Sequence, residues 1–508
     1  METSDIESNK LDQPIFNKNK KKVHKKISIS KKLGIGAIIL ITFISFILLN
    51  YFNKNNNNSI LIEKNDKNEK NQLNEECPPG YKVENGQCIL NYSFKATYKT
   101  FNDNNIVELI NSIKPENIIE MTVENEKVEP SNKYLFKKKG KYTVYFLVDI
   151  SNLDSLSGMF DGIINLESIS FTEIFNTEKI IKMDHMFRNC KSLIEVDISK
   201  FNTKNVKQMD FMFFGCNALI SLDLSNFNNE NLVNMNRMFF QCSSLQSINL
   251  KNFTTTKVED MSYVFANCNN IRTIDLSSFD TKNVKTMRGM FERCKSLFYA
   301  SIRTFNLEKV QDVAYMFNKC YSLVSVDTAD FYAPNVNTMI SMFYQCKALT
   351  SLDLSKFNGE KVTELDNMLE GCSSLSYVNF ANFNAPNLKK LDYLFFFNTA
   401  LTSIDLTNFK TDSIISMNGM FQGCSHLKKI DLSSFNTQNV ETMVDMFNGC
   451  SSLQKIDISN FNMEKTQHLQ RIFNNCPSLD KGEILVNKNS YNKVKRHILP
   501  NISLDAID

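Results

Sequence analysis

The sequence predicts an α/β solenoid, a curved stack of about twelve strand–turn–helix units. Three observations predict it: a cysteine column, a phenylalanine column and a change of apolar period within each unit. Apart from Cys77 and Cys88, the cysteines stand 26 residues apart with a single step of 52, at positions 190, 216, 242, 268, 294, 320, 346, 372, 424, 450 and 476. Phenylalanine recurs with the same period from Phe175 to Phe461. A fixed period of this length is typical of repeat proteins, whose units bury apolar surface only by stacking on their neighbours.

The apolar spacing within one unit locates the expected elements. Between Val206 and Cys216 the apolar residues are spaced 3, 3, 1 and 3, which is typical of one face of an amphipathic helix, and Asn205 suits its N-cap. Leu222-Asp223-Leu224 then alternates, as a short half-buried strand does. Because paired strands lie about 4.8 Å apart and packed helices about 8 to 10 Å apart, we expect the strand side of the stack to be concave.

The periodic cysteines are expected to form a buried column of free thiols. Each lies four residues after an apolar position, as Cys216 follows Met212, and therefore faces the core. Single cysteines at this period match no zinc-ligand spacing; disulfides between neighbours and metal or redox chemistry are the alternatives. The column is interrupted at Asn398, directly after Phe395-Phe396-Phe397, which indicates a local irregularity or a contact patch.

Residues 33–52 are expected to form a transmembrane signal-anchor helix, because 33–49 carry no charge and the segment is long enough to span a bilayer. Residues 1–32 form a basic tail, which the positive-inside rule places in the cytoplasm. Residues 53–76 are polar and predict a flexible stalk. The chain would then be a single-pass type II protein of the plasma membrane with its C-terminal solenoid on the exoplasmic side. A cleaved signal peptide is the alternative.

The remaining chain divides into four further segments. Turn-forming residues between Cys77 and Cys88 predict a disulfide, so 77–88 is a stapled spacer. Residues 89–150 are rich in β-branched and aromatic residues and predict a small β-rich domain that caps the array. Residues 151–481 hold the repeat solenoid, and 482–508 form a C-terminal cap or tail.

The repeat resembles a known family. The pattern V-x-x-M-x-x-M-F-x-x-C-x-x-L-x-x-L-D-L-S-x-F, seen in Val206 to Phe227 and again in Val440 to Phe461 with two isoleucines, is similar to the repeat of BspA-like leucine-rich repeat surface proteins of microbes. The resemblance covers roughly residues 151–480. It implies a leucine-rich-repeat-like solenoid displayed at a cell surface, with roles in adhesion or in binding host or matrix molecules. It implies no catalytic residues.

The outward positions of the strands form an acidic ladder. Its members are Asp197, Asp223, Asp275, Asp327, Asp353, Asp405, Asp431 and Asp457. Carboxylates about 4.8 Å apart repel by roughly 1 kcal/mol in water, so something should compensate. The functional hypothesis is a cation such as calcium, or a basic partner. The alternative is that each Asp bonds nearby backbone amides and stays hydrated.

Larger side chains on the same face are candidates for ligand binding. Lys251, Tyr299, Arg303 and Tyr377 break the small-polar pattern, and Tyr and Arg dominate interface hot spots. Neutral drift of exposed positions is the alternative. Four sequons, at Asn57, Asn91, Asn252 and Asn501, are glycosylation candidates.

Charge and motifs limit the function classes. Net charge is +3, and residues 1–32 supply +5, so the body is not basic enough for nucleic-acid binding. No metal-protease, nucleophile-elbow or Walker motif is present, so we expect no enzyme and no cofactor beyond possible calcium. The preferred function is a membrane-anchored surface recognition or adhesion protein whose concave strand face binds an extracellular or host macromolecule. The alternatives are a self-associating surface coat, an enzyme carrier and an internal-membrane scaffold; the oligomeric state is left open.

Overall fold

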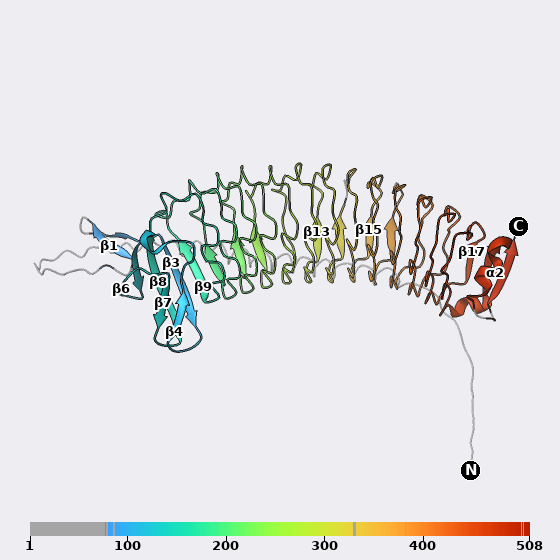
Figure 1. Ribbon diagram of the computed structural model, residues 1–508, viewed down its shortest axis with the longest axis horizontal. Helices are drawn as coiled ribbons and strands as arrows, with labels where there is room; N and C mark the ends of the chain where they lie inside the picture. Colours follow the sequence, from blue (N-terminus) through green and yellow to red (C-terminus); the bar gives the residue numbers. More distant parts are fainter. Residues whose placement is uncertain are drawn as a thin grey trace, which may run out of the picture. The chain divides into compact units, whose positions relative to one another are not determined.

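The computed structural model describes residues 77, 80–84, 87–328, 332–381, 383–498, 500 and 502–507. The predicted tail, anchor and stalk (1–76) lie outside these residues. Among the described residues, no helix combines the length and apolar character needed to cross a bilayer. The chain after Glu75 forms one compact unit, in which the coils follow one another in single file from β9 to β17 (Figure 1).

A short hairpin opens the unit. Strands β1 (Tyr81–Glu84) and β2 (Gln87–Leu90) pair antiparallel. The predicted disulfide between Cys77 and Cys88 is confirmed, and it ties the start of the hairpin to β2.

A six-stranded sheet joins the N-terminal segment to the first coils. Its strands, in the order β10-β9-β3-β8-β5-β6, are Glu195–Asp197, Leu166–Phe171, Phe94–Thr100, Gly140–Val148, Ile118–Val123 and Glu126–Val128. Two more strands, β4 (Asn105–Glu108) and β7 (Lys133–Phe136), pair with each other, and a 3-10 turn, η1, spans Pro115–Asn117. Alternate residues of β3 are buried, as expected for a strand with one face on a core. Because β3 pairs antiparallel with β9, it covers the edge that the first coil would otherwise expose.

Many of the coils contribute one short strand, and the corresponding residues 273–275, 403–405 and 429–431 form none. The named strands of the array are β11 (Ser221–Asp223), β12 (Ser247–Asn249), β13 (Tyr299–Ser301), β14 (Ser325–Asp327), β15 (Ser351–Asp353), β16 (Tyr377–Asn379) and β17 (Lys455–Ile458). Pairs such as β11 and β12 are parallel and in register at the 26-residue period, with Leu222 opposite Ile248. A second row of parallel bridges runs along the opposite side of the coils, through residues 155, 182, 208, 234, 260, 286, 312, 338 and 364, and again through 390, 416, 442 and 468.

The predicted helix in each unit is wrong. Phe211 (φ +56°) and Gly215 (φ +72°) are left-handed, and these two positions are left-handed in coil after coil. The Met212 N–H donates to the carbonyl of Met209, three residues back, whereas the Phe213 N–H donates to Met238 of the next coil. The segment is therefore a run of tight turns hydrogen-bonded to its neighbours, and the coils form a β-solenoid.

The concave strand side was expected because packed helices are spaced more widely than paired strands, and the described residues of the coils contain no such helices. Ring centroids of successive phenylalanines beside the turn segments, from Phe187 to Phe343, lie 5.3 to 5.8 Å apart. Paired strands lie about 4.8 Å apart. The wide helix-side spacing on which the expected concave strand face depended is absent.

The core consists of stacked columns. Phe291 packs face to face with Phe265 and Phe317, at interplanar angles of 8° and 7°. The expected column of buried thiols is confirmed: among the described residues, each periodic cysteine is buried and outside any disulfide. The Cys294 thiol donates to the carbonyl of Phe265 at 3.0 Å, and burial raises the pKa of this thiol to about 12. The column is thus a packing element with its polar atoms satisfied.

The C-terminal end closes the sheet with two further strands. After η2 (Pro477–Lys481), β18 (Glu483–Asn487) pairs parallel with β17, and β19 (Ser503–Ile507) pairs parallel with β18. Helix α2 (Lys488–Lys495) lies between these strands in the chain and is capped by the Asn487 side chain, which accepts from the Ser490 N–H.

Candidate functional site

The strand face is the surface formed by the outward residues of the short strands. In β11, Leu222 is buried whereas Ser221 and Asp223 are exposed. The same alternation recurs in β13 and β15. The face is therefore a regular lattice of short polar side chains on a rigid backbone, as the alternation predicted.

The acidic ladder is satisfied locally at most of its steps. Seven of its carboxylates accept a hydrogen bond of 2.8 to 3.0 Å from the backbone N–H two residues further on; they are Asp197, Asp223, Asp275, Asp353, Asp405, Asp431 and Asp457. These bonds are the largest cause of the lowered pKa of Asp275 and Asp405. The pKa of Asp431 is lowered first by the Ser433 side chain and then by the Ser433 N–H. This turn is a common use of Asp after a strand. In the part of the chain that the structure describes, no three His, Cys, Asp or Glu residues are grouped to hold a metal ion.

The larger side chains on the face form a stripe and are not gathered in one pocket. The tyrosine rings are 40% exposed at Tyr299 and 58% exposed at Tyr377. Tyr299 pairs with Ser325 and Tyr377 with Ser351, so the two tyrosines stand three coils apart, about 14 Å. The Arg303 guanidinium lies 3.9 Å from the Asp327 carboxylate of the next coil. Lys251 is exposed two coils before Arg303.

Hollows lie along this face or at its rim. One of about 220 Å³ is lined by Tyr377, Asn379, Ala381, Ser403, Asp405 and Asn408. A second, of about 420 Å³, lies where β3, β8, β9 and β10 present Lys95, Tyr145, Ser170, Glu195 and Asp197. A third, of about 700 Å³, is lined by Gln246, Ser247, Asn270, Arg272 and Ser296. Tyr377 and two members of the acidic ladder, Asp197 and Asp405, thus border concave surface.

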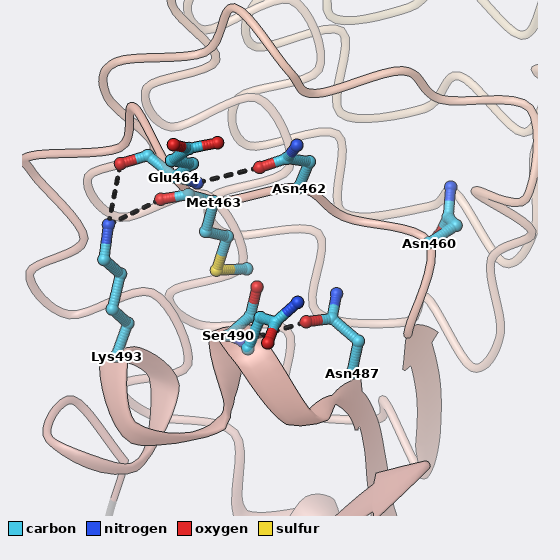
Figure 2. A pocket seen from close by; sticks show the side chains of 8 residues that line it. Asn460, Asn462, Met463, Glu464, Asn487, Ser490 and Lys493 are labelled. Atoms are coloured by element: carbon cyan, nitrogen blue, oxygen red, sulfur yellow. Dashed lines mark hydrogen bonds between the residues drawn. The ribbon is translucent and has the colours of Figure 1, made fainter. Parts of the chain in front are cut away.

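A fourth hollow lies at the C-terminal end, where polar groups of α2 hydrogen-bond to the last coil. It measures about 480 Å³ and lies between the last coil and α2 (Figure 2). Figure 2 shows the Lys493 ammonium reaching the main chain of the last coil, where it donates to the carbonyls of Met463 (2.6 Å) and Glu464 (3.1 Å). These bonds occupy carbonyls that a further coil would otherwise use.

Two sequons lie in the described part of the chain. The Nδ2 of Asn252, the atom that a glycan would occupy, donates to the carbonyl of Ser225 at 2.7 Å. Asn91 follows β2 and is half-buried, with its backbone N–H donating to Gly80. Asn57 and Asn501 lie outside the described residues.

Sequence reasoning missed a second patterned surface. We call it the turn face: it carries the columns at positions 185, 211, 237 and onward, and 188, 214, 240 and onward, beside the second row of bridges. His185 stacks on Phe211 at 4.9 Å, and Arg237 lies between Phe211 and Tyr263. Reading these positions in the 26-residue register would have shown that aromatic residues recur in both columns.

The architecture defines the class of protein: a tandem-repeat β-solenoid. Four overlapping segments, 154–273, 260–383, 324–404 and 389–498, match the family described as "Mycoplasma protein of unknown function, DUF285". They span more than half of the chain, so the chain belongs to the DUF285 family.

Comparison with solved structures finds chains of low sequence identity. A leucine-rich repeat protein from Eubacterium ventriosum is 16% identical, with 58% of this chain and 80% of that chain covered and a TM-score of 0.33. TLR13 in complex with ssRNA13 is 16% identical over 65% of this chain and 50% of that chain, with a TM-score of 0.22. The functional domain of InlJ from Listeria monocytogenes, which includes a cysteine ladder, is 13% identical over 67% of each chain, with a TM-score of 0.21. No curated protein shows a significant match. These similarities assign no ligand or activity to this chain.

Proposed function

We propose that this chain is a non-enzymatic recognition protein anchored in the plasma membrane through residues 33–52, with its solenoid exoplasmic. Its strand face binds a macromolecule of the host or the extracellular matrix. The proposal joins the anchor and stalk expected from the sequence to a solenoid of the DUF285 family. It also takes up the resemblance of the repeat to BspA-like surface proteins.

The observation that carries the proposal is the hollow beside Tyr377. An exposed tyrosine at the wall of a shallow pocket is the arrangement typical of a hot spot, since a partner side chain can fill the pocket and exclude water from the ring. Around it, short hydroxyl and carboxylate side chains repeat at a fixed spacing on a backbone that pairs in register with β15. A stable interface needs roughly 800 Å² per partner, which a face extending from β10 to β17 can supply.

Surface staining tests the placement. Antibody against the repeats should bind unpermeabilised cells. Staining only after permeabilisation would contradict the anchored, outward arrangement.

The binding role is tested with the full chain displayed on cells and with immobilised extracellular-matrix proteins as probes. The double substitution Tyr299→Ala, Tyr377→Ala should weaken attachment by about tenfold, the loss expected for an exposed hot spot. Leu135→Ala on β7 is the matched control, since Leu135 is 47% exposed and lies away from the repeats. Attachment lost equally in both variants would contradict the strand-face assignment. Concentration-dependent self-association without attachment to any probe would favour the surface-coat alternative.

A further inference from the structure

Four aromatic rings on the turn face have a cation of their own chain over them. The Arg237 guanidinium lies 5.7 Å from the ring centroid of Phe211 and 4.7 Å from that of Tyr263. Arg288 lies 4.9 Å from Tyr315, and the Lys319 ammonium lies 5.5 Å from Tyr344. A cation over a ring face is attracted by the negative face of the π system. Each of these rings therefore already has an electrostatic partner.

One aromatic cluster further along the same face differs. Tyr393, Phe396 and Phe397 contact one another edge to face, with centroids 5.5 Å apart for the first pair and 4.5 Å for the second. The exposed fraction is 39% for Tyr393 and 51% for Phe397. Within the described chain, no lysine or arginine lies over any of these three rings.

Glycines of the next coil allow two of the rings to lie on the surface. A Cβ at Gly419 would lie 2.6 Å from the Tyr393 ring, and a Cβ at Gly423 would lie 3.0 Å from the Phe397 ring. Both glycines are left-handed, a conformation that costs glycine little. The rings therefore rest against backbone on one side, which holds them in place while the other side stays exposed.

Three carboxylates lie near the cluster, and one of them is paired with a cation. Burial, followed by the charges of Asp392, Asp445 and Glu370, raises the pKa of Tyr393, and the charge of Arg471 opposes this shift. Asp445 is neutralised, because the Arg471 guanidinium donates to both of its oxygens, at 2.8 and 2.5 Å. The hydrogen-bond donors to Asp392 and Glu370 are neutral groups: Asp392 accepts from the Ser416 hydroxyl and the Asn418 N–H, and Glu370 accepts from the Asn367 amide and the Tyr344 hydroxyl.

We propose that the Tyr393–Phe396–Phe397 cluster, with Glu370 and Asp392, is a docking site for an arginine or lysine side chain presented by a protein partner. The partner's cation would occupy the position that Arg237, Arg288 and Lys319 hold over four other rings of the turn face. The carboxylates attract the cation and the rings retain it, so that charge and aromatic surface select the same group. The site lies apart from the strand face and is independent of the function proposed there.

The test uses the full chain and a fluorescein-labelled peptide of alternating arginine and glycine, with binding followed by fluorescence anisotropy at low ionic strength. The double substitution Tyr393→Ala, Phe397→Ala should weaken binding about tenfold, since two cation–π contacts are lost while every charge is kept. Phe298→Ala is the matched control, because Phe298 is 57% exposed and lies beside β13. Its affinity should equal that of the unmodified chain.

Two further measurements separate cation–π binding from other causes. Tyr393→Leu, Phe397→Leu keeps apolar surface without π faces and should lose as much affinity as the alanine variant. Glu370→Gln keeps the acceptor for Asn367 but removes a charge, and should weaken binding severalfold and reduce its salt dependence. Full affinity in the leucine variant, an equal loss in Phe298→Ala, equal binding of a glycine–serine peptide, or no binding by the unmodified chain would each overturn the proposal.

Discussion

The regular coils and the junction between Glu364 and Asn398 share the 26-residue period but differ in the pairing of their turn segments. In the regular coils a bridge joins each turn segment to the next, as at Asp260, Thr286 and Asp312. At the junction, no bridge joins Glu364 to Lys390, although both residues lie in the described chain. The strand side of the same coils stays paired, with Leu352 opposite Val378.

Several departures from the consensus coincide at this junction. Leu369 replaces a column phenylalanine, and Asn398 replaces a column cysteine. Asn398 is fully buried, and neither polar atom of its side chain has a partner. One oxygen of Asp366 is also buried without a partner, one coil before Asp392. At this junction the row of bridges on the turn side is interrupted, while the pairing of β15 with β16 carries the array across it.

Removing a phenylalanine ring from its column should lower the free energy of unfolding more than any other change. The loss should be larger in the regular coils than at the junction. Phe291→Ala leaves a cavity between Phe265 and Phe317 and should cost about 3 to 5 kcal/mol. Leu369→Ala should cost less, because a smaller side chain is removed where the stack is already interrupted. Urea unfolding measures both. A larger loss for Leu369→Ala would reverse the comparison.

Replacing Asn398 by the cysteine of the other coils should increase the stability of the chain. Asn398→Cys removes two unpartnered buried polar atoms and should stabilise the chain by about 1 to 3 kcal/mol. The reciprocal change, Cys294→Asn, should destabilise a regular coil by a similar amount, since the thiol there donates to Phe265. The thermal midpoint measures both. An unchanged midpoint in Asn398→Cys would mean that the asparagine side chain has partners in solution.

The junction should also respond to pH. Burial and then the charge of Asp392 raise the pKa of Asp366 to about 6 from its ordinary 3.8. The folded chain thus binds this proton more tightly than the unfolded chain, so the contribution of Asp366 to stability is lost as pH rises from about 4 through 6. Allowing for solvent screening of this half-buried group, the loss is about 1 kcal/mol.

Asp366→Asn isolates this effect. The difference in unfolding free energy between the variant and the original chain should change with pH over that window and stay constant above it. A difference that is independent of pH would show that Asp366 is not perturbed.

The smallest effects are expected on the strand face of the regular coils. Asp275→Asn keeps the acceptor for the Ser277 N–H and should change stability by less than about 0.5 kcal/mol, whereas Asp275→Ala should cost about 1 kcal/mol. Calcium at millimolar concentration should leave the thermal midpoint unchanged, because these carboxylates already accept backbone hydrogen bonds. A midpoint raised by calcium would restore the metal hypothesis.

Periodicity in the sequence was sufficient to predict the stack, the inward columns and the outward residues of the strands. The helix was mispredicted for a physical reason. Tight turns with left-handed residues at 211 and 215 bring the same apolar residues to one side at the 3-and-4 spacing that a helix uses. The left-handed conformation is not typical of the residue types at Phe211, Arg237 and Tyr263, so the sequence does not indicate it there. It is typical of the glycines and asparagines in the column from Asn189 to Asn475.

The candidate sites show the same limit. Tyr299 and Tyr377 were correctly placed on the surface because alternation along a strand decides that direction. The cluster at Tyr393 depends on a backbone geometry that the expected helix did not have. Its lack of a cation is visible only once the neighbouring arginines are placed.

Because one period is one complete coil, duplication or loss of 26 residues would return the chain to the same register at both ends. The strand that covers the first coil and the helix that closes the last would meet unchanged partners. The reach of the molecule could therefore be altered in steps of about 5 Å without a new fold having to evolve.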